Sequence, residues 1–264
     1  MVKLMNYVSK NYCSQRIAKE WIDDGRITVN GKPGTWMQEV DPKKDVIKHK
    51  HIVIKDQKEV VIIMNKPKGY VVTSLDNRNG ENSIYKILKV DEKVIPVGRL
   101  DRLSEGLIIF TNNGELAQRL MRPEYNVERT YIVYVIGQIS HDKIKDVKLK
   151  GVDIGGHLSK PKQFSLIEKS KQGNKIISEL KVILTEGKNR EIRKMMDILG
   201  LRVIKLQRIN YANIRLGGLK EKRYRYLTRK EIDELKNLVK LLNYDDKNQE
   251  SITSTSNDSD SSFS

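Results

Sequence analysis

The sequence contains one cysteine, Cys13, and only four histidines among its 264 residues. A single cysteine excludes an internal disulfide framework and is typical of a reducing compartment. The histidines are too scattered, and the cysteine too solitary, for the ligand spacing of a zinc finger. We therefore expect no bound metal, and chemistry without a metal if the protein is an enzyme.

Long apolar runs are also lacking. No segment approaches the roughly 20 consecutive apolar residues that a membrane-spanning helix needs. The first residues, MVKLMNYVSKNYCSQRIAKEW, do not contain the apolar stretch followed by small residues that marks a secretory signal. We expect a cytoplasmic protein that does not enter a membrane.

Positive charge dominates the sequence. Lysine and arginine total 50 and the acidic residues 34, which gives a net charge of +16. The last twenty residues contain five acids and one lysine and contribute −4, so the preceding part of the chain carries +20. This excess favours a polyanionic partner, with nucleic acid ahead of an anionic membrane surface.

Hydrophobic periodicity divides the chain into three parts. Residues 1–57 predict two short helices and a hairpin whose Asn30-Gly31 pair forms a tight turn. Residues 58–243 mix strands and helices joined by short turns, which predicts an α+β domain with a mixed, largely antiparallel sheet. Periodicity stops in residues 244–264, where serine dominates, so we expect a disordered tail.

Several elements are predicted individually. Ser14 is a candidate N-cap of the second helix. Further helices are expected around residues 83–88 and over 114–121, and strands at 94–97 and 107–111. NREIRKMMDILG predicts an amphipathic helix, since Ile, Met, Met and Leu recur at i, i+3, i+4 and i+7. We expect Asn189 to cap its start and Gly200 to end it.

Asp101 lies in the connection between the predicted strands VIPVG and GLIIFT, beside two arginines. Spacing alone favours a turn cap or a surface ion pair. Glu105 raises only a weak case for the paired carboxylates of a glycosidase. Arg193 lies at the margin between the core and solvent faces of its helix, where it can point into a cleft and keep a carboxylate ionised. A phosphate contact or a solvated basic face explains Arg193 equally well.

Tyr131 and Tyr134 are three residues apart in the predicted strand RTYIVYVIG, so they face opposite sides of the sheet. Core packing is the usual place of a strand tyrosine. In a nucleic-acid cleft, however, a tyrosine stacks on an extruded base. From the strand alone both interpretations stay open.

Four segments together resemble the RsuA/RluB/RluF-type ribosomal RNA pseudouridine synthases. LMNYVSKNYCSQRIAKEWIDDGRITVNGK is similar to an S4 RNA-binding domain, and NKPKGYVVTS to the first motif of the catalytic domain. GRLDRLSEGLIIFTNNGEL resembles the signature around the catalytic aspartate, and EGKNREIRKMMDILGLRVIKLQRI the third motif. The match runs in order through the chain except its tail. Among these types, RluF, which modifies 23S rRNA, is the best match.

The resemblance implies a small S4 domain followed by a catalytic domain with a central sheet and an RNA-binding cleft. It implies that Asp101 is catalytic, that Arg193 is its ion-pair partner and that Tyr131 stacks on the target uracil. The turn at Lys66-Pro67 would brace the catalytic loop. The residues that we expect to contact RNA are Arg99, Lys66, Arg190, Lys194, Arg16 and Lys19.

The implied reaction converts a specific uridine of ribosomal RNA, most simply 23S rRNA, into pseudouridine after the base has left its stack. No atoms are gained or lost, so we expect no cofactor. The expected partner is a stem-loop with an accessible uridine, and we expect the protein to act as a monomer. Alternatives are the same chemistry on 16S rRNA or tRNA, or a non-catalytic rRNA-binding assembly factor.

Three positions differ from the usual pattern of the family. Ser104 replaces a common threonine and keeps a hydroxyl, and Lys188 replaces an arginine and keeps the charge. Glu191 replaces a usual glutamine and adds a negative charge near Arg193. The role of Glu191 is open.

Overall fold

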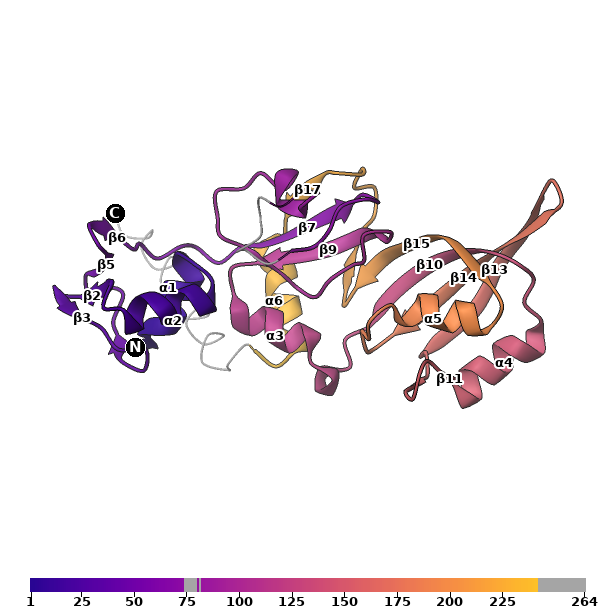
Figure 1. The fold of residues 1–264 in the computed structure, drawn as a ribbon, viewed down its shortest axis with the longest axis horizontal. Coiled ribbons are helices and arrows are strands. Elements are labelled where there is room, and N and C mark those ends of the chain that lie inside the picture. The colour runs from indigo at the N-terminus through magenta and orange to yellow at the C-terminus, as the bar shows by residue number, and fades with distance from the viewer. Residues whose placement is uncertain (74–79, 81, 242–264) are drawn as a thin grey trace, which may run out of the picture.

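The computed structural model describes residues 1–73, 80 and 82–241; the tail predicted at 244–264 lies outside this part of the chain. Figure 1 shows an elongated molecule with a small N-terminal unit at one end, a large sheet in the middle and a long hairpin at the other end. Within the described ranges, no helix combines the length and apolar character needed to cross a membrane.

The N-terminal unit consists of two helices packed beside short strands. Its elements are β1 (Val2–Lys3), α1 (Leu4–Asn11), α2 (Gln15–Asp23), β2 (Ile27–Val29), β3 (Lys32–Pro33), β4 (Glu39–Val40), β5 (Ile47–His49) and β6 (Ile52–Val53). The predicted cap is confirmed, because Oγ of Ser14 accepts a hydrogen bond from the backbone N–H of Ile17. The predicted turn is confirmed too, since Asn30 and Gly31 both have positive φ, as a type I′ hairpin turn requires.

The N-terminal unit has a hydrophobic core of its own. Buried apolar side chains from α1, α2 and the short strands, from Leu4 to Ile54, form one cluster. The apolar side chains from Val60 onward form two other clusters. The unit therefore has a core of its own, separate from the two cores that flank the larger sheet.

The rest of the described chain is built on a nine-stranded sheet with the order β13-β14-β10-β15-β9-β7-β17, to which β8 and β16 attach at β9 and β15. Its strands are β7 (Val61–Lys66), β8 (Ile95–Pro96), β9 (Glu105–Thr111), β10 (Arg129–Ile136), β13 (Gln163–Gln172), β14 (Lys175–Leu184), β15 (Arg202–Tyr211), β16 (Ile214–Arg215) and β17 (Tyr224–Tyr226). Among these strands β9 and β15 pair in parallel and the others pair antiparallel. The predicted α+β class with a mixed, largely antiparallel sheet is confirmed.

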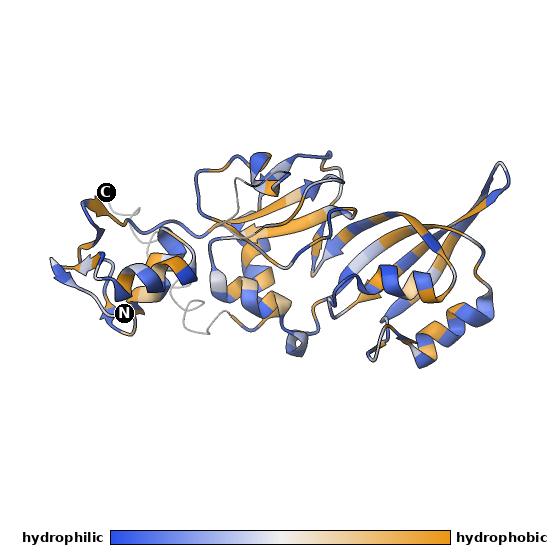
Figure 2. Ribbon diagram, viewed as in Figure 1, coloured by the Kyte–Doolittle hydropathy of each residue, from blue (hydrophilic) through white to orange (hydrophobic). Residues whose placement is uncertain are grey.

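Strands β7 and β9 are buried on both faces, which explains their almost continuous apolar sequence (Figure 2). Val61 and Ile63 face one core, which includes side chains of α3 (Gly114–Met121) and α6 (Arg229–Leu238). Ile62 and Met64 face the other core, which includes side chains of α5 (Glu191–Ile198) and of strands β10 and β14.

The remaining elements are short, apart from one helix near the hairpin. They are the 3₁₀ turns η2 (Ile84–Lys86) and η3 (Pro123–Tyr125), helix α4 (His141–Lys150), and the paired strands β11 (Val152–Asp153) and β12 (Leu158–Ser159). The helix expected around 83–88 is therefore wrong in length. A single 3₁₀ turn forms there, in which Oγ of Ser83 accepts from the N–H of Tyr85, and the chain then leaves helical geometry.

Helix α5 begins differently from the prediction. The residue before it is Arg190, which has φ of 52° and makes no side-chain cap, so the expected cap by Asn189 is wrong. The carboxylate of Glu191 instead accepts a hydrogen bond from the N–H of Lys188 at 3.0 Å. The predicted end is confirmed, since Gly200 follows the last turn with φ of +72°.

Candidate active site

A pocket of about 470 Å³ opens beside the connection between β8 and β9. That connection, strands β10 and β15 and the segment before α5 all contribute to its wall. Six of the lining side chains are cationic and two are carboxylates: Arg99, Arg129, Lys188, Arg190, Arg193 and Arg208 against Asp101 and Glu191. This excess of positive charge suits an anionic ligand.

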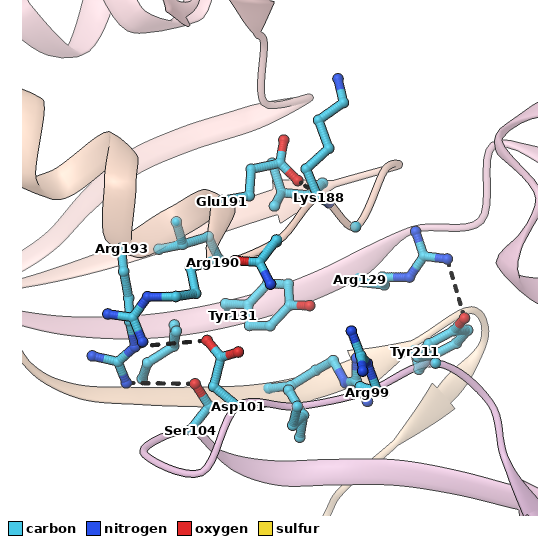
Figure 3. A pocket seen from close by; sticks show the side chains of 18 of the residues that line it. Arg99, Asp101, Ser104, Arg129, Tyr131, Lys188, Arg190, Glu191, Arg193 and Tyr211 are labelled. Atoms are coloured by element: carbon cyan, nitrogen blue, oxygen red, sulfur yellow. Dashed lines mark hydrogen bonds and ion pairs between the residues drawn. The ribbon is translucent and has the colours of Figure 1, made fainter. Parts of the chain in front are cut away.

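Asp101 and Arg193 face each other in this pocket (Figure 3). Nε of Arg193 lies 4.0 Å from Oδ2 of Asp101. Nη2 of Arg193 donates to the carbonyl oxygen of Leu103 at 3.0 Å and to Oγ of Ser104 at 3.4 Å. The guanidinium group therefore holds the backbone of the Asp101 loop while it faces the carboxylate. The Asp101 side chain stays one-third exposed, so a ligand in the pocket reaches it.

Lys66, at the end of β7, supports the same loop from below. Nζ of Lys66 donates to the carbonyl oxygens of Pro67 (3.1 Å), Asp101 (3.1 Å) and Ser104 (2.6 Å). The side chain is fully buried, and burial lowers the pKa of Lys66 from 10.5 to about 8. All three donors of the ammonium group are used inside the protein. The expectation that Lys66 contacts RNA is therefore wrong, whereas the expected bracing of the loop fits these contacts.

Four residues form a row across the sheet beneath the loop. Tyr131 of β10 pairs with Arg208 of β15, Arg208 pairs with Gly106 of β9, and Gly106 pairs with Lys66 of β7. Directly paired residues point their side chains to the same face of a sheet. Tyr131, Arg208 and Lys66 thus lie in order on the face that carries Asp101.

Gly106 allows the parallel strands to meet closely in this row. A Cβ at Gly106 would lie 2.2 Å from the carbonyl oxygen of Arg208 and 2.8 Å from its nitrogen, and φ of Gly106 is +100°. Both the contact and the backbone conformation require glycine.

Tyr211 fills the pocket wall between two arginines. The guanidinium carbons of Arg129 and Arg208 lie 4.9 Å and 5.0 Å from the centre of its ring. Its hydroxyl accepts a hydrogen bond from Nη2 of Arg129 and donates one to the carbonyl oxygen of Leu120. Nη1 of Arg129 donates to the carbonyl oxygen of Thr185. These contacts fix Arg129 as part of the wall.

Glu191 is turned away from Arg193, toward the segment before α5 (Figure 3). Its Oε1 accepts from Oγ of Ser159 at 2.6 Å, and its Oε2 accepts from the N–H of Lys188 at 3.0 Å. The carboxylate is thus used to shape the segment that carries Lys188 and Arg190 to the pocket.

The other predicted RNA contacts occupy different places. Arg99 and Arg190 line the pocket and are exposed at its rim. Lys194 is exposed on α5 and does not line the pocket. Arg16 and Lys19 are exposed on α2 in the N-terminal unit, and Arg16 lies 3.7 Å from Glu20.

Sequence reasoning did not identify Arg208, Arg129 or Tyr211. One signal for Arg208 was present: in KLQRINY it occupies the inward position next after Leu206, where a strand of this kind normally carries an apolar residue. No comparable signal marked Arg129 or Tyr211. Across the described ranges, no three or more His, Cys, Asp or Glu side chains gather in a way that would hold a metal ion.

Comparison with known proteins decides the family. The sequence profile of RNA pseudouridylate synthases matches residues 60–197, and that of the S4 domain matches residues 2–35. The chain belongs to the RNA pseudouridylate synthase family. It is an enzyme that isomerises uridine in RNA, and its N-terminal unit contains an S4 domain.

Relatives match this pseudouridine synthase over most of its length. The dual-specificity RNA pseudouridine synthase RluF of Escherichia coli K12 is 34% identical over 91% of this chain and 79% of its own. The ribosomal large subunit pseudouridine synthase B of Bacillus subtilis is 30% identical over 86% of this chain and 91% of its own. The crystal structure of a pseudouridylate synthase, 22% identical, covers 89% of this chain and 100% of its own with a TM-score of 0.60, which shows the same fold.

Proposed function

We propose that this enzyme forms pseudouridine with Asp101 as its catalytic residue, acting on a uridine of 23S rRNA. The observation that carries the proposal is the placement of the Asp101 carboxylate, one-third exposed, in a cationic pocket 4.0 Å from Arg193. A carboxylate repels phosphate and so weakens the binding of a polyanion in this pocket. A direct role in the reaction at the sugar explains why Asp101 is there.

The reaction breaks the bond between C1′ and N1, turns the uracil and joins C5 to C1′. Ionised Asp101 either attacks C1′ as a nucleophile or removes a proton from the sugar to start an elimination, and both routes release the uracil. Arg193 keeps the Asp101 carboxylate oriented, because its Nη2 donates a hydrogen bond to the backbone of the loop. Tyr131, which lines the pocket, would hold the detached ring while it rotates.

A second cavity supports a path by which RNA reaches the pocket. It has a volume of about 1280 Å³ and lies between the helices of the N-terminal unit and helix α3. Pro96, Arg99 and Met121 line both cavities, so the two are adjacent at the Arg99 side chain. Lys10, on α1, and Arg119 and Arg122 lie along the second cavity. A strand bound beside α1 would thus lead past Arg99 to Asp101, with backbone affinity that weakens as salt rises.

The proposal of 23S rRNA as the substrate is supported by the names of related enzymes. The match in Bacillus subtilis is named for the large ribosomal subunit, whereas RluF is named as dual-specific. A stem-loop is the expected form of the substrate, since its unstacked bases leave the helix at low cost. The alternatives are a site in 16S rRNA or in tRNA.

The remaining proposals concern the domain boundary, the oligomeric state, the cellular compartment and the cofactor. We propose a boundary near residue 57 between an S4 domain, residues 1–57, and a catalytic domain, residues 58–243, which brackets the two matched ranges. We also propose a monomer that works in the cytoplasm without a cofactor, since the isomerisation is redox-neutral and adds no atoms.

Purified enzyme incubated with unmodified 23S rRNA, 16S rRNA and total tRNA, followed by pseudouridine mapping, tests the proposal. We expect one site, in a loop of 23S rRNA. Product in 16S rRNA or tRNA alone would reject the proposed target. No product in any of them, with RNA binding intact, would reject all three RNAs as substrates in their free, unmodified form.

A further inference from the structure

Arg208 carries a charge that the protein itself leaves partly unsatisfied. The side chain is 2% exposed, and its Nε donates to the carbonyl oxygen of Leu107 at 2.6 Å. Nη2 is buried without a hydrogen-bond partner, and no acidic side chain in the described part of the chain forms an ion pair with it. Burying such a group is unfavourable unless a ligand completes it. Since Arg208 lines the pocket, a ligand that completes this group would approach it from there.

The position of Arg208 indicates which part of the substrate it meets. Its Cα pairs directly with that of Tyr131, so the two side chains are neighbours on one face, with Cβ atoms about 5 Å apart. A base stacked on Tyr131 therefore has Arg208 at its edge. Phosphates, in contrast, stay near solvent. The exposed side chains of Arg99 and Arg190, at the rim of the pocket, are placed to contact them.

We propose that Arg208 is a further catalytic residue, which donates hydrogen bonds to the uracil ring and neutralises the negative charge that the ring acquires as it leaves C1′. The inference rests on the proposed function, because it needs uracil to be detached in this pocket. No other residue that lines the pocket combines nearly complete burial, an unsatisfied guanidinium nitrogen and direct pairing with Tyr131.

The charge on the ring follows from the chemistry. When the C1′–N1 bond breaks, its electron pair stays with N1 and spreads onto the O2 and O4 oxygens, so the ring is an anion in both routes open to Asp101. The anion persists until C5 bonds to C1′, which uses the ring's electron pair and either releases the Asp101 carboxylate from C1′ or follows return of its proton to the sugar. The proton on C5 then leaves and N1 takes up a proton, so the product is neutral. A fixed cationic donor beside O2 or O4 stabilises this state more than it stabilises neutral uridine, and it therefore accelerates the reaction.

A substrate with a better leaving group separates this role from a structural one. Fluorine at C5 withdraws electrons and stabilises the uracil anion without help from the enzyme. Fluorine takes the place of the C5 proton that leaves in the last step, so 5-fluorouridine cannot complete that step and the experiment measures release of the base from C1′. It follows the single-turnover loss of the N1-linked nucleoside at the target position of one stem-loop RNA, which carries either uridine or 5-fluorouridine there. The enzymes compared are the wild type, Arg208→Gln, and Arg202→Gln as the control, since Arg202 is exposed on the same strand.

For uridine we expect Arg208→Gln to be slower than the wild type by about 100-fold, the loss typical of one oxyanion-stabilising donor. For 5-fluorouridine we expect the deficit to shrink to about tenfold or less, because the ring then needs less stabilisation. RNA affinity of the variant should stay within about twofold, and Arg202→Gln should match the wild type with both substrates.

Equal deficits with the two substrates would overturn the inference and indicate a structural role. A loss confined to RNA affinity would overturn it in favour of a phosphate contact. If Arg208→Gln does not fold, Arg208→Lys decides by the same comparison, because it keeps a charge but loses the forked donor geometry. Wild-type enzyme that forms no pseudouridine would instead reject the proposed function, so the two failures are distinguishable.

Discussion

Nε of Arg193 lies 4.0 Å from Oδ2 of Asp101, although the two residues are ninety-two positions apart in the chain. This nitrogen is buried and has no hydrogen-bond partner, whereas Nη2 already holds the carbonyl oxygen of Leu103. A small shift of the carboxylate would turn the contact into a charge-assisted hydrogen bond. Catalytic contacts are often long before substrate binds and tighten in the complex.

Replacement of Arg193 tests this relationship. Arg193→Met should reduce single-turnover product formation by about 100-fold. The loop would lose the hydrogen bond at Leu103, and the Asp101 carboxylate would no longer be held in its orientation. Arg193→Lys should recover part of the rate, since it keeps the charge without the fork. RNA affinity, measured in parallel by filter binding, should change little in both variants. Wild-type rates for Arg193→Met would show that Asp101 does not depend on this contact.

Lys66 should make the activity sensitive to alkaline pH. Its ammonium group donates to three carbonyl oxygens of the turn and the loop, and its pKa is lowered to about 8 by burial. Above that pH the neutral amine has only two donors, so the Asp101 loop loosens. We expect single-turnover rates to fall as pH rises through about 8 while RNA affinity stays constant. A flat rate profile from pH 7 to 9.5 would contradict this role.

The stability effect of Lys66 has the opposite sign. Between pH 8 and 10.5 the unfolded chain keeps the proton that folded Lys66 has released, so the folded state gains stability as pH rises. The free energy of unfolding of the wild type, relative to Lys66→Met, should therefore increase by roughly 2–3 kcal/mol across this window. Urea unfolding at pH 7.5, 9 and 10.5 measures the difference. A constant difference would show that the pKa is not lowered in the folded state.

Gly106 has a matched control elsewhere in the chain. Gly106 and Gly155 have similar positive φ, +100° and +96°, but a Cβ would meet the backbone of Arg208 only at Gly106. Gly155→Ala should cost about 1–2 kcal/mol of unfolding free energy from backbone strain alone. Gly106→Ala should cost at least about twice as much and reduce activity, because the row beneath Asp101 must shift. Equal costs would mean that the strands separate easily.

Glu191 is expected to tolerate glutamine. The carboxylate accepts from Ser159 and from the N–H of Lys188. In Glu191→Gln the amide oxygen can accept from Lys188 while its NH₂ donates to the serine hydroxyl, so the segment keeps its shape. Activity should stay within about threefold of the wild type, whereas Glu191→Leu should lose both contacts and destabilise the segment. A large loss in Glu191→Gln would assign the negative charge itself a role in the reaction.

Much of the fold follows from local signals. The Ser14 cap, the Asn30-Gly31 turn and the end of α5 at Gly200 depend on the chemistry of a few neighbouring residues, and all three are as predicted. The expected cap at Asn189 is wrong, because α5 begins after Arg190, which adopts a left-handed backbone conformation. Glu191, at the first position of the helix, contacts the distant hydroxyl of Ser159, and no local pattern contains that contact.

The site was predictable only where sequence motifs marked it. Spacing alone favoured an ordinary surface role for Asp101, and the resemblance to a family pointed to Arg193 as its partner. The row that joins Tyr131, Arg208 and Lys66 depends on the register of four strands drawn from distant parts of the sequence. The register is set only when these distant segments meet in the folded sheet. The sequence alone therefore did not reveal Arg208 as a neighbour of Tyr131.

The most direct test is pseudouridine formation by Asp101→Asn. Asparagine has nearly the same size and keeps a carbonyl oxygen, and the backbone oxygen that Lys66 holds is unchanged, so the loop should fold as before. We expect RNA affinity within about threefold of the wild type and no detectable pseudouridine in single-turnover assays, because the amide is neither a nucleophile nor a base. Pseudouridine formed by Asp101→Asn at a rate near that of the wild type would show that Asp101 is not the catalytic residue.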